Sequence, residues 1–221
     1  MAKQYFVTST GTGIGKTYVT AALIRQARAK QMSVAATKPV ISGFDKHEIA
    51  ASDTGALLAA LGVAPTLEMV EKISPWRFAA PLAPNMAARA EGKSLDCEAL
   101  FAHGRAALHE KADLILIEGV GGVMVPLDQK NTVLDWIAAL DAPVLLVVGA
   151  YLGTISHTLT AVAVLHMRAA KLAAIVVNEG EGASVAFDDT LAEIAKWAAP
   201  VPVFGLRRGA DGAALARLLD P

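Results

Sequence analysis

A lysine, a threonine and several glycines lie close together near the N-terminus, in a spacing that can hold phosphate groups. The segment Thr10-Gly-Thr-Gly-Ile-Gly-Lys-Thr17 follows a strand-like run and precedes a helix-forming stretch. Backbone N–H groups of such a turn point inward, and the N-terminus of the next helix adds positive potential. Lys16 can reach the β- and γ-phosphates of a nucleotide, and the hydroxyl of Thr17 can hold Mg²⁺. The segment therefore predicts a phosphate-binding loop.

The loop departs from the strict motif, which has glycine at the position of Thr10. Gly11 and Gly13 lie inside the loop instead. A glycine-rich turn with a chance lysine is the alternative, but strand, glycines, Lys-Thr and helix occur in the order that the motif requires. We therefore expect a variant nucleotide-binding loop that includes Gly13, Ile14, Gly15, Lys16, Thr17 and Tyr18.

Two carboxylates further along the chain are candidates for holding Mg²⁺ together with Thr17. Glu118 follows four apolar residues and precedes a Gly-x-Gly-Gly turn, where acids of the Walker B type supply a metal ligand. The alternative for Glu118 is an acidic turn residue. Asp53, within Ser-Asp-Thr, fits the N-cap of a helix as well as it fits a metal ligand. From the residues alone, both interpretations of Asp53 stay open.

Lys38 is the other residue with a clear chemical possibility. It ends an apolar strand-like run and is followed by Pro-Val-Ile-Ser-Gly, an unusual place for a solvated helix-face charge. At the mouth of a parallel sheet its ammonium could neutralise charge on a transferring phosphoryl group or on a carboxylate-like acceptor. The alternative is a strand-end lysine in solvent.

Alternating strand and helix patterns indicate what positions these residues. Strands are expected at 4–8, 33–37, 114–117, 144–148, 173–177 and 201–204. Helices are expected at about 15–30, 53–61, 83–90, 96–110, 132–140, 155–170, 185–198 and 211–219. This alternation predicts one α/β domain over residues 1–221, a doubly wound, mostly parallel sheet with helices on both faces, of the P-loop NTPase type. Ligands of such sheets bind at the carboxyl ends of the strands, where the candidate residues lie.

The composition narrows the classes of function. The chain is 54% hydrophobic but only 5% aromatic, which suits buried parallel strands covered by Ala-rich helices. No apolar stretch reaches about 18 residues, so we expect no membrane partner, and the start leaves no room for a signal peptide. A formal charge of −1 gives no basic footprint for nucleic acid. The single cysteine, Cys97, is expected on a helix face rather than in catalysis. We expect a soluble, cytoplasmic protein with a small-molecule substrate.

Five motifs together resemble the dethiobiotin synthetase family. They are Thr-x-Thr-Gly-x-Gly-Ile-Gly-Lys-Thr at residues 8–17, Lys-Pro-Val-x-Ser-Gly at 38–43, Ser-Asp-Thr at 52–54, Pro-x-x-Pro-Asn-x-Ala-Ala at 81–88 and Glu-Gly-Val-Gly-Gly at 118–122. The resemblance runs in order from residue 4 to about 180. The Lys38 and Glu118 motifs, at this separation in a chain this short, are its most specific part.

The resemblance implies a chemistry. The family uses ATP and Mg²⁺ to close a ureido ring on 7,8-diaminononanoate with CO₂ or bicarbonate as the carbon source. One amine takes up CO₂ as a carbamate, the carbamate oxygen attacks the γ-phosphate, and the second amine displaces phosphate from the resulting anhydride. Positioning and charge neutralisation supply most of the catalysis in such a transfer.

The resemblance also implies roles for residues of this chain. Lys16 and Lys38 would stabilise the carbamate and the transferring phosphoryl group, and Asp53 becomes an expected Mg²⁺ ligand beside Thr17 and Glu118. The remaining expected ATP contacts are Gly119, Val120, Gly121 and Asn178, with Asn178 at the adenine edge. Thr12 and Ser42 would line the substrate pocket. The family is homodimeric, and a loop of the partner, here about 151–156, would hold the substrate carboxylate through Gly153, Thr154, Ile155 and Ser156 at a helix N-terminus.

Some positions depart from the family pattern. Ser9 stands where glycine is common, Gly11 where an acid is frequent, and Asn85 where many members have histidine. Residues 205–209 lack the Pro-Trp-Leu-like adenine clamp of some relatives, so the base selectivity stays open. The nearest alternative is a ParA/MinD-like ATPase switch, but positions 9–13 lack the second lysine typical of that class. The absence of Asn-Lys-x-Asp disfavours a GTPase, and 221 residues leave no room for the glutaminase domain of a cobyrinate-type amidotransferase.

Overall fold

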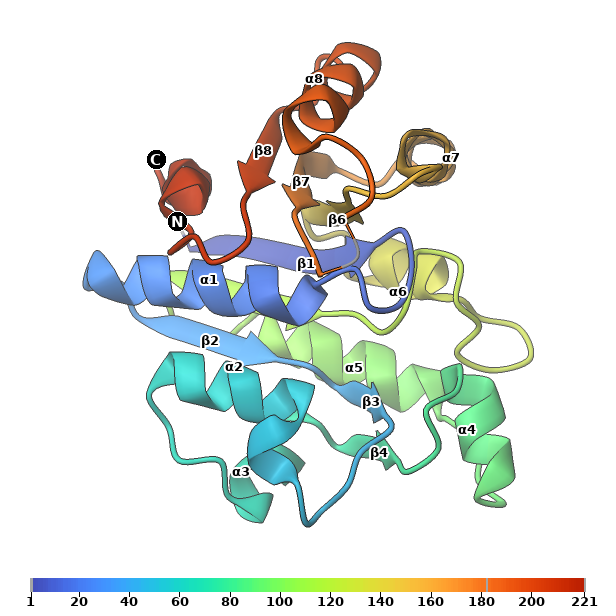
Figure 1. Cartoon of the computed structure of the whole chain (residues 1–221). Helices are drawn as coiled ribbons and strands as arrows, with labels where there is room; N and C mark the ends of the chain where they lie inside the picture. Colours follow the sequence, from blue (N-terminus) through green and yellow to red (C-terminus); the bar gives the residue numbers. More distant parts are fainter. Residues whose placement is uncertain (1, 182, 221) are drawn as a thin grey trace.

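Six parallel strands form the central sheet of the protein, in the order β2-β5-β1-β6-β7-β8 (Figure 1). The computed structural model describes residues 2–181 and 183–220. The strands are β1 (Lys3–Ser9), β2 (Val34–Thr37), β5 (Leu114–Glu118), β6 (Val144–Gly149), β7 (Leu172–Asn178) and β8 (Val203–Leu206). The expected fold class is confirmed.

Helices cover both faces of this sheet. They are α1 (Lys16–Ala29), α2 (Asp53–Leu61), α3 (Leu67–Ile73), α4 (Pro84–Ala90), α5 (Cys97–Ala107), α6 (Val133–Leu140), α7 (Thr154–Met167) and α8 (Phe187–Trp197), with two 3₁₀ turns, η1 (Ile49–Ala51) and η2 (Ala213–Leu219). Because strand side chains alternate between faces, Phe6 joins the core under α5 to α8 while Val7 joins the core under α1, α2 and η2. Both faces are therefore buried, as the continuous apolar strands predict.

The central strand β1 lies at the point where the strand order reverses. From β1 the chain moves outward to β2 and returns through β5, whereas β6, β7 and β8 follow on the other side of β1. Parallel sheets of this kind bind ligands in the crevice at such a switch point. The residues after β1, β2 and β5 are therefore the ones that can meet over a ligand.

The structure contains four short elements that we did not predict from the sequence. A second, two-stranded parallel sheet pairs β3 (Val40–Ser42) with β4 (Trp76–Phe78), and α3 and η1 lie between them in the chain. Three residues are too few to show a period, and prolines at 39 and 75 interrupt the apolar runs.

Two expected boundaries at the C-terminal end are wrong. The last strand begins at Val203 rather than at Val201, because Pro202 has no N–H to give to the ladder, although its carbonyl accepts from Ile175. The expected helix at 211–219 is a 3₁₀ turn from Ala213 to Leu219, which begins after Gly212 in the left-handed conformation.

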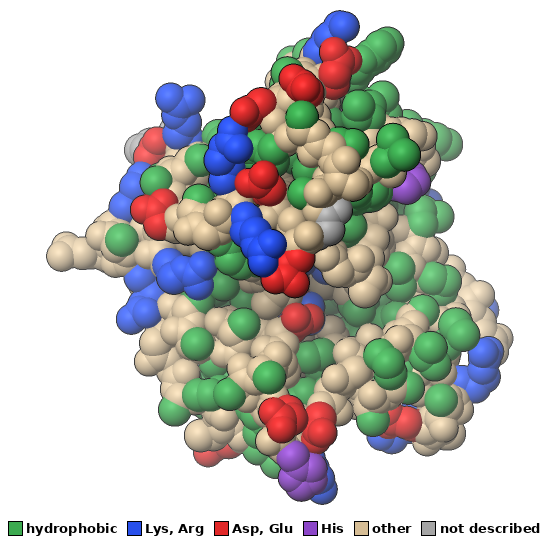
Figure 2. Space-filling view, in the orientation of Figure 1, with side chains coloured by type: hydrophobic (Ala, Val, Ile, Leu, Met, Phe, Trp, Pro, Cys, Tyr) green, Lys and Arg blue, Asp and Glu red, His purple; other side chains and the backbone are tan. Residues whose placement is uncertain are grey.

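The surface agrees with the low net charge. On the face seen in Figure 2, acidic and basic side chains are interspersed rather than gathered into a patch of one sign. Among the described residues, none of the helices combines the length and the apolar character needed to cross a membrane.

Cys97 is buried as the first residue of α5, and burial, followed by the nearby Asp128, raises the pKa of its thiol to about 12. A thiol with this pKa is a poor nucleophile, which supports its expected structural role.

Candidate active site

The loop between β1 and α1 has the backbone of a phosphate-binding loop. Gly13 and Gly15 have φ of 73° and 98°, a conformation that favours glycine, and Gly15 caps the N-terminus of α1. A side chain at Gly15 is also excluded by space, because its Cβ would lie 2.2 Å from Nδ2 of Asn178. That amide nitrogen donates a hydrogen bond to the carbonyl of Ile14 at 3.0 Å. Asn178, at the end of β7, therefore stabilises the loop through this hydrogen bond.

Lys16 is held under the loop with its ammonium in reach of the phosphate position. Nζ donates to the hydroxyl of Ser9 at 3.1 Å and to the carbonyl of Gly11 at 3.4 Å, and the residue is only 7% exposed. Burial is the main cause that lowers its pKa, to about 8, and the charge of Lys38 adds to this effect. Glu118 and Asp53 oppose the shift. The phosphates of a bound nucleotide would act as the anionic partner of this ammonium and stabilise its charged form.

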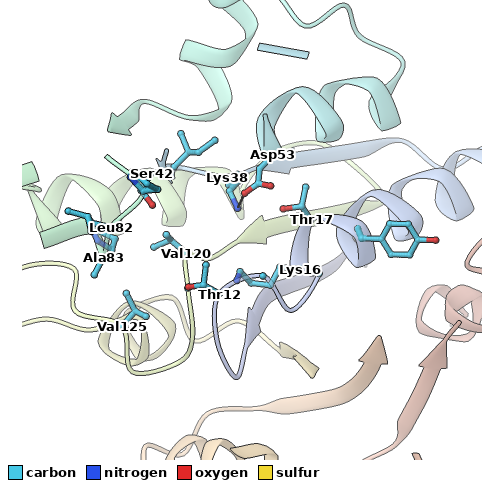
Figure 3. Close-up of a pocket in the computed structure, with 17 residues that line it drawn as sticks. Thr12, Lys16, Thr17, Lys38, Ser42, Asp53, Leu82, Ala83, Val120 and Val125 are labelled. Carbon is cyan, nitrogen blue, oxygen red and sulfur yellow. Dashed lines mark ion pairs between the residues drawn. The ribbon is translucent and has the colours of Figure 1, made fainter. Parts of the chain in front are cut away.

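A buried cluster of charged groups lies beside Lys16, at the carboxyl ends of β2 and β5. Oε1 of Glu118 accepts a hydrogen bond from Thr17 Oγ1 at 2.6 Å and forms an ion pair with Lys38 Nζ at 2.6 Å. Lys38 Nζ lies 2.9 Å from Oδ2 of Asp53 as well (Figure 3). Glu118 is fully buried and Lys38 is 3% exposed, whereas Asp53 is half exposed. Residues 17, 38, 53 and 118 therefore meet at one point.

The ion pair between Lys38 and Asp53 shifts their pKa values in opposite directions, upward for Lys38 and downward for Asp53. Burial alone would lower the pKa of Lys38, but the charges of Glu118 and Asp53 and their hydrogen bonds raise it above its usual value. Burial would raise the pKa of Asp53, but Lys38 and Thr17 lower it below its usual value. Both groups are therefore charged at neutral pH.

The helix α2 excludes the N-cap interpretation of Asp53. The side chain of Ser52 accepts a hydrogen bond from the backbone N–H of Gly55 at 3.0 Å and so caps the helix. Asp53 lies in the first turn, and its carboxylate is free of capping and directed at Lys38. This leaves Asp53 available as a ligand.

The oxygen atoms of the cluster fit Mg²⁺. Thr17, Asp53 and Glu118 offer a hydroxyl and two carboxylates, the hard oxygen donors that Mg²⁺ prefers. Oε2 of Glu118 is buried without a hydrogen-bond partner among the described residues. No group of three or more His, Cys, Asp or Glu side chains within the described ranges could enclose a metal. The set therefore suits a cation that keeps waters and phosphate oxygens among its ligands, as Mg²⁺ does.

A cavity of about 700 Å³ opens over this cluster, and most of the expected site residues line it. Those residues are Thr12, Gly13, Gly15, Lys16, Thr17, Tyr18, Lys38, Ser42, Asp53, Val120 and Gly121. Glu118 lies buried beneath the cavity. Ile14, Gly119 and Asn178 support its floor: the N–H of Gly119 donates to the carbonyl of Val7, and a Cβ there would approach the ring of Phe6 to 2.9 Å.

One wall of the cavity was not assigned from the sequence. It is mainly apolar and consists of Ile41, Pro81, Leu82, Ala83, Pro84 and Val125 (Figure 3). The Pro-x-x-Pro segment was a recognisable signal for part of this wall, but nothing in its residue types indicated that it faces the ligand. The cavity therefore has a charged end at the phosphate loop and an apolar end at residues 81–84.

The expected carboxylate-binding turn lies elsewhere in the chain. Gly153, with φ of 96°, caps α7, and Thr154 is buried with its hydroxyl donating to the carbonyl of Gly149 at 2.8 Å. None of residues 153–156 lines the cavity. Within one chain, the structure does not bring this turn to the site.

Comparisons of the sequence with known proteins indicate a family. A family model described as an AAA domain matches residues 3–206. The chain is 49% identical over 209 residues to the ATP-dependent dethiobiotin synthetase BioD of Methylobacterium nodulans, covering 92% of both chains. It is 46% identical over 204 residues to the protein of that name from Acidiphilium cryptum, covering 91% of this chain and 92% of that one.

The chain belongs to the ATP-dependent dethiobiotin synthetase family. Solved structures that resemble it share the fold at low identity. The septum site-determining protein MinD of Pyrococcus horikoshii, solved with Mg-ADP, has a TM-score of 0.58 at 16% identity and covers 99% of this chain and 95% of its own. HypB of Helicobacter pylori has a TM-score of 0.54 at 15% identity, covering 98% and 84%. These solved structures share only the fold with this chain, whereas the matches over most of the sequence indicate the synthetase family.

Proposed function

We propose that this chain catalyses the ATP- and Mg²⁺-dependent ring closure of 7,8-diaminononanoate with CO₂ to dethiobiotin, releasing ADP and phosphate. The observation that carries the proposal is the buried cluster at the carboxyl ends of β2 and β5. It places two lysines, two carboxylates and a threonine hydroxyl at one end of a cavity whose other end is apolar. Phosphoryl transfer to a carbamate needs this charge pattern, and an aliphatic diamine needs the apolar wall.

In the proposed reaction one amine of the substrate attacks CO₂ to give a carbamate. A carbamate oxygen then attacks the γ-phosphorus of ATP, which forms a carbamic–phosphoric anhydride and releases ADP. The second amine attacks the anhydride carbon, the C–O bond to phosphate breaks, and the ureido ring closes. Each amine loses a proton on the way to the urea.

The residues of this chain would act mainly by position and charge. The loop amides and Lys16 would hold the β- and γ-phosphates, and Lys38, which lines the same cavity, would neutralise the carbamate and the transferring group. Thr17, Asp53 and Glu118 would hold Mg²⁺, which when bound offsets the charge on the phosphate oxygens. Thr12 and Ser42 would hydrogen-bond at the junction between the charged and apolar ends.

The nucleotide base would lie beyond the phosphate loop at the end of β7. Oδ1 of Asn178 is buried without a hydrogen-bond partner among the described residues, which supports its expected contact with an exocyclic amine of the base.

The substrate carboxylate would be held by a second copy of the chain. Residues 153–156 begin a helix of 14 residues yet do not line the cavity of their own chain. A homodimer that brings the partner's turn over the apolar end would complete the site, with helix N–H groups binding the carboxylate. The proposed assembly is therefore a dimer with substrate sites at the subunit interface.

Phosphate release from Mg-ATP in bicarbonate buffer, with and without 7,8-diaminononanoate, tests the proposal. We expect hydrolysis that requires the diamine and a ring-closed product detected by mass spectrometry. CTP and GTP in parallel would show the base selectivity. Slow ATP hydrolysis at the same rate with and without the diamine would contradict the proposed synthetase activity. It would favour a nucleotide-dependent switch, the class suggested by the MinD-like fold.

A further inference from the structure

We propose that Lys38 is the internal counter-ion of the metal site: in the ligand-free protein its ammonium occupies the place of the divalent cation, which must displace it to bind. This inference rests on the metal-assisted transfer proposed above and adds an antagonism between Lys38 and the metal. The consequence is that Lys38 becomes available to the reacting groups only when the carboxylates have taken up the cation.

The contacts of Lys38 carry the first step. Its ammonium bridges two carboxylates from different elements, Glu118 at the end of β5 and Asp53 at the start of α2, at 2.6 and 2.9 Å. These two side chains are also the candidate anionic ligands of the metal. Oε1 of Glu118 already has two donors at 2.6 Å, from Lys38 and Thr17. A cation bound between both carboxylates would therefore compete with Lys38 for the same oxygens.

The charge of the cluster supplies the second step. Lys16 and Lys38 contribute two positive charges, and Asp53 and Glu118 contribute two negative charges. Adding a divalent cation to this buried, electrically balanced group is unfavourable unless anions arrive with it. A nucleotide brings such anions as its phosphates. We therefore expect weak metal binding without nucleotide and tight binding with it.

The position of Lys38 supplies the third step. Its side chain lines the cavity, so an ammonium released from the carboxylates remains beside the place where the phosphoryl group and its acceptor meet. An alternative arrangement makes a different prediction. If the cation used only Oε2 of Glu118, which has no partner among the described residues, and the hydroxyl of Thr17, Lys38 could keep its ion pairs throughout.

Titration with Mn²⁺ in the absence of nucleotide, followed by electron paramagnetic resonance, separates these arrangements. We expect Lys38→Gln to bind Mn²⁺ at least about tenfold more tightly than the wild type, since its carboxylates lose their competitor. Lys38→Arg keeps the charge and should bind like the wild type. Lys16→Gln is the matched control, because it removes an equal charge from the same site, while the partners of Lys16 Nζ among the described residues are Ser9 and Gly11. It should increase the affinity much less.

Two results would overturn the inference: equal affinity in Lys38→Gln and the wild type, or an equal increase in Lys16→Gln and Lys38→Gln. The gain must also disappear in the double variant Lys38→Gln, Glu118→Gln. Mn²⁺ binding to the complex with a non-hydrolysable ATP analogue is compared between the wild type and Glu118→Gln. If Glu118→Gln does not weaken this binding, the metal site of the proposed function is wrong, and so is the inference. If the complex binds Mn²⁺ tightly through Glu118 but Lys38→Gln does not change the affinity without nucleotide, the result contradicts this inference and leaves the proposed function intact.

A measurement on wild-type protein covers the case in which Lys38→Gln does not fold. The ¹³Cε resonance of Lys38, assigned from the Lys38→Arg spectrum, reports its ion pairs. We expect this resonance to shift when Mg²⁺ is added to the protein with the ATP analogue, relative to the analogue alone. No shift on saturation with Mg²⁺ would overturn the displacement of Lys38.

Discussion

At Glu118 the two oxygens of one buried carboxylate have different surroundings. Oε1 accepts from Thr17 and pairs with Lys38, whereas Oε2 has no partner among the described residues. An isolated buried oxygen with full negative character is costly, so such an atom is a candidate position for a ligand. In the ligand-free protein the side chain therefore holds Thr17 and Lys38 through Oε1, and Oε2 is a second position at which the proposed cation could bind once Lys38 is displaced.

Glu118→Gln tests the binding position. We expect ATP affinity in the presence of Mg²⁺ to fall at least about tenfold, equivalent to ~1.4 kcal/mol, because an anionic ligand is lost. Metal-free ATP binding should change much less. Isothermal titration with and without Mg²⁺ makes the comparison, with the surface variant Glu110→Gln as control. An equal loss under both conditions would mean that the substitution damaged the fold rather than a metal site.

The sequence predicted this site unevenly, residue by residue. Lys38 and Glu118 were predictable as candidates because they lie at the ends of strands, and Lys16 and Thr17 because they lie in the loop motif after β1; the strand ends of a parallel sheet meet at one edge. Asp53 was ambiguous because a helix start offers the same residue types for capping and for binding. The hydrogen bond that the N–H of Gly55 donates to Ser52 Oγ excludes the capping role of Asp53, and no spacing rule contains it.

The loop that enters α6 shows how one carboxylate organises a connecting element. Asp128 Oδ1 accepts from the N–H groups of Lys130 and Asn131 at 2.7 and 2.6 Å, and Oδ2 accepts from Asn131 Nδ2 at 2.9 Å. Burial works against ionisation here, but these hydrogen bonds outweigh it and lower the pKa of Asp128 from 3.8 to about 2. The ionised form is thus the one that holds the loop together.

Asp128→Asn should therefore destabilise the protein in a pH-dependent way. Since the folded-state pKa is lowered, the stabilisation is fully present above about pH 4 and is lost as the pH falls through about 2. We expect a loss of about 1–2 kcal/mol in the free energy of unfolding at pH 7. Urea denaturation at pH 7 and at the lowest pH where the protein folds measures it. Asp189→Asn is the control, and a difference that is independent of pH would contradict the assignment.

The elements themselves were predictable where they are long. Continuous apolar runs such as 114–117 and 144–148 fit buried parallel strands, and both occur as β5 and β6. The pairing of β3 with β4 joins residues 40–42 to 76–78 and depends on how the chain between them folds back. Local periodicity does not contain that information, which is why the apolar wall beside this small sheet was missed.

On the scale of the whole molecule, the two ends of α7 offer a matched test of the proposed dimer. Leu152, just before the helix, is 85% exposed, and Met167, its last residue, is 84% exposed. We expect Leu152→Asp to raise the dimer dissociation constant at least about tenfold and to reduce diamine-dependent turnover, because a charge would enter the interface. Met167→Asp should do neither. Sedimentation velocity and phosphate release measure both effects, and equal behaviour of the two variants would contradict the placement of the interface.

The position of β1 has a consequence for how the protein is made. Lys3–Ser9 leave the ribosome long before their neighbours in the sheet, residues 114–118 and 144–147. At translation rates of roughly 5–20 residues per second, about 140 further residues take roughly 7–28 s to appear. The apolar side chains of Phe6 and Val7 have no native strand beside them until residues 114–118 appear, and they gain the second strand only with residues 144–147. The nascent chain thus carries its glycine-rich loop next to an apolar segment that lacks its sheet partners, and we expect a chaperone to bind this segment until β5 and β6 emerge.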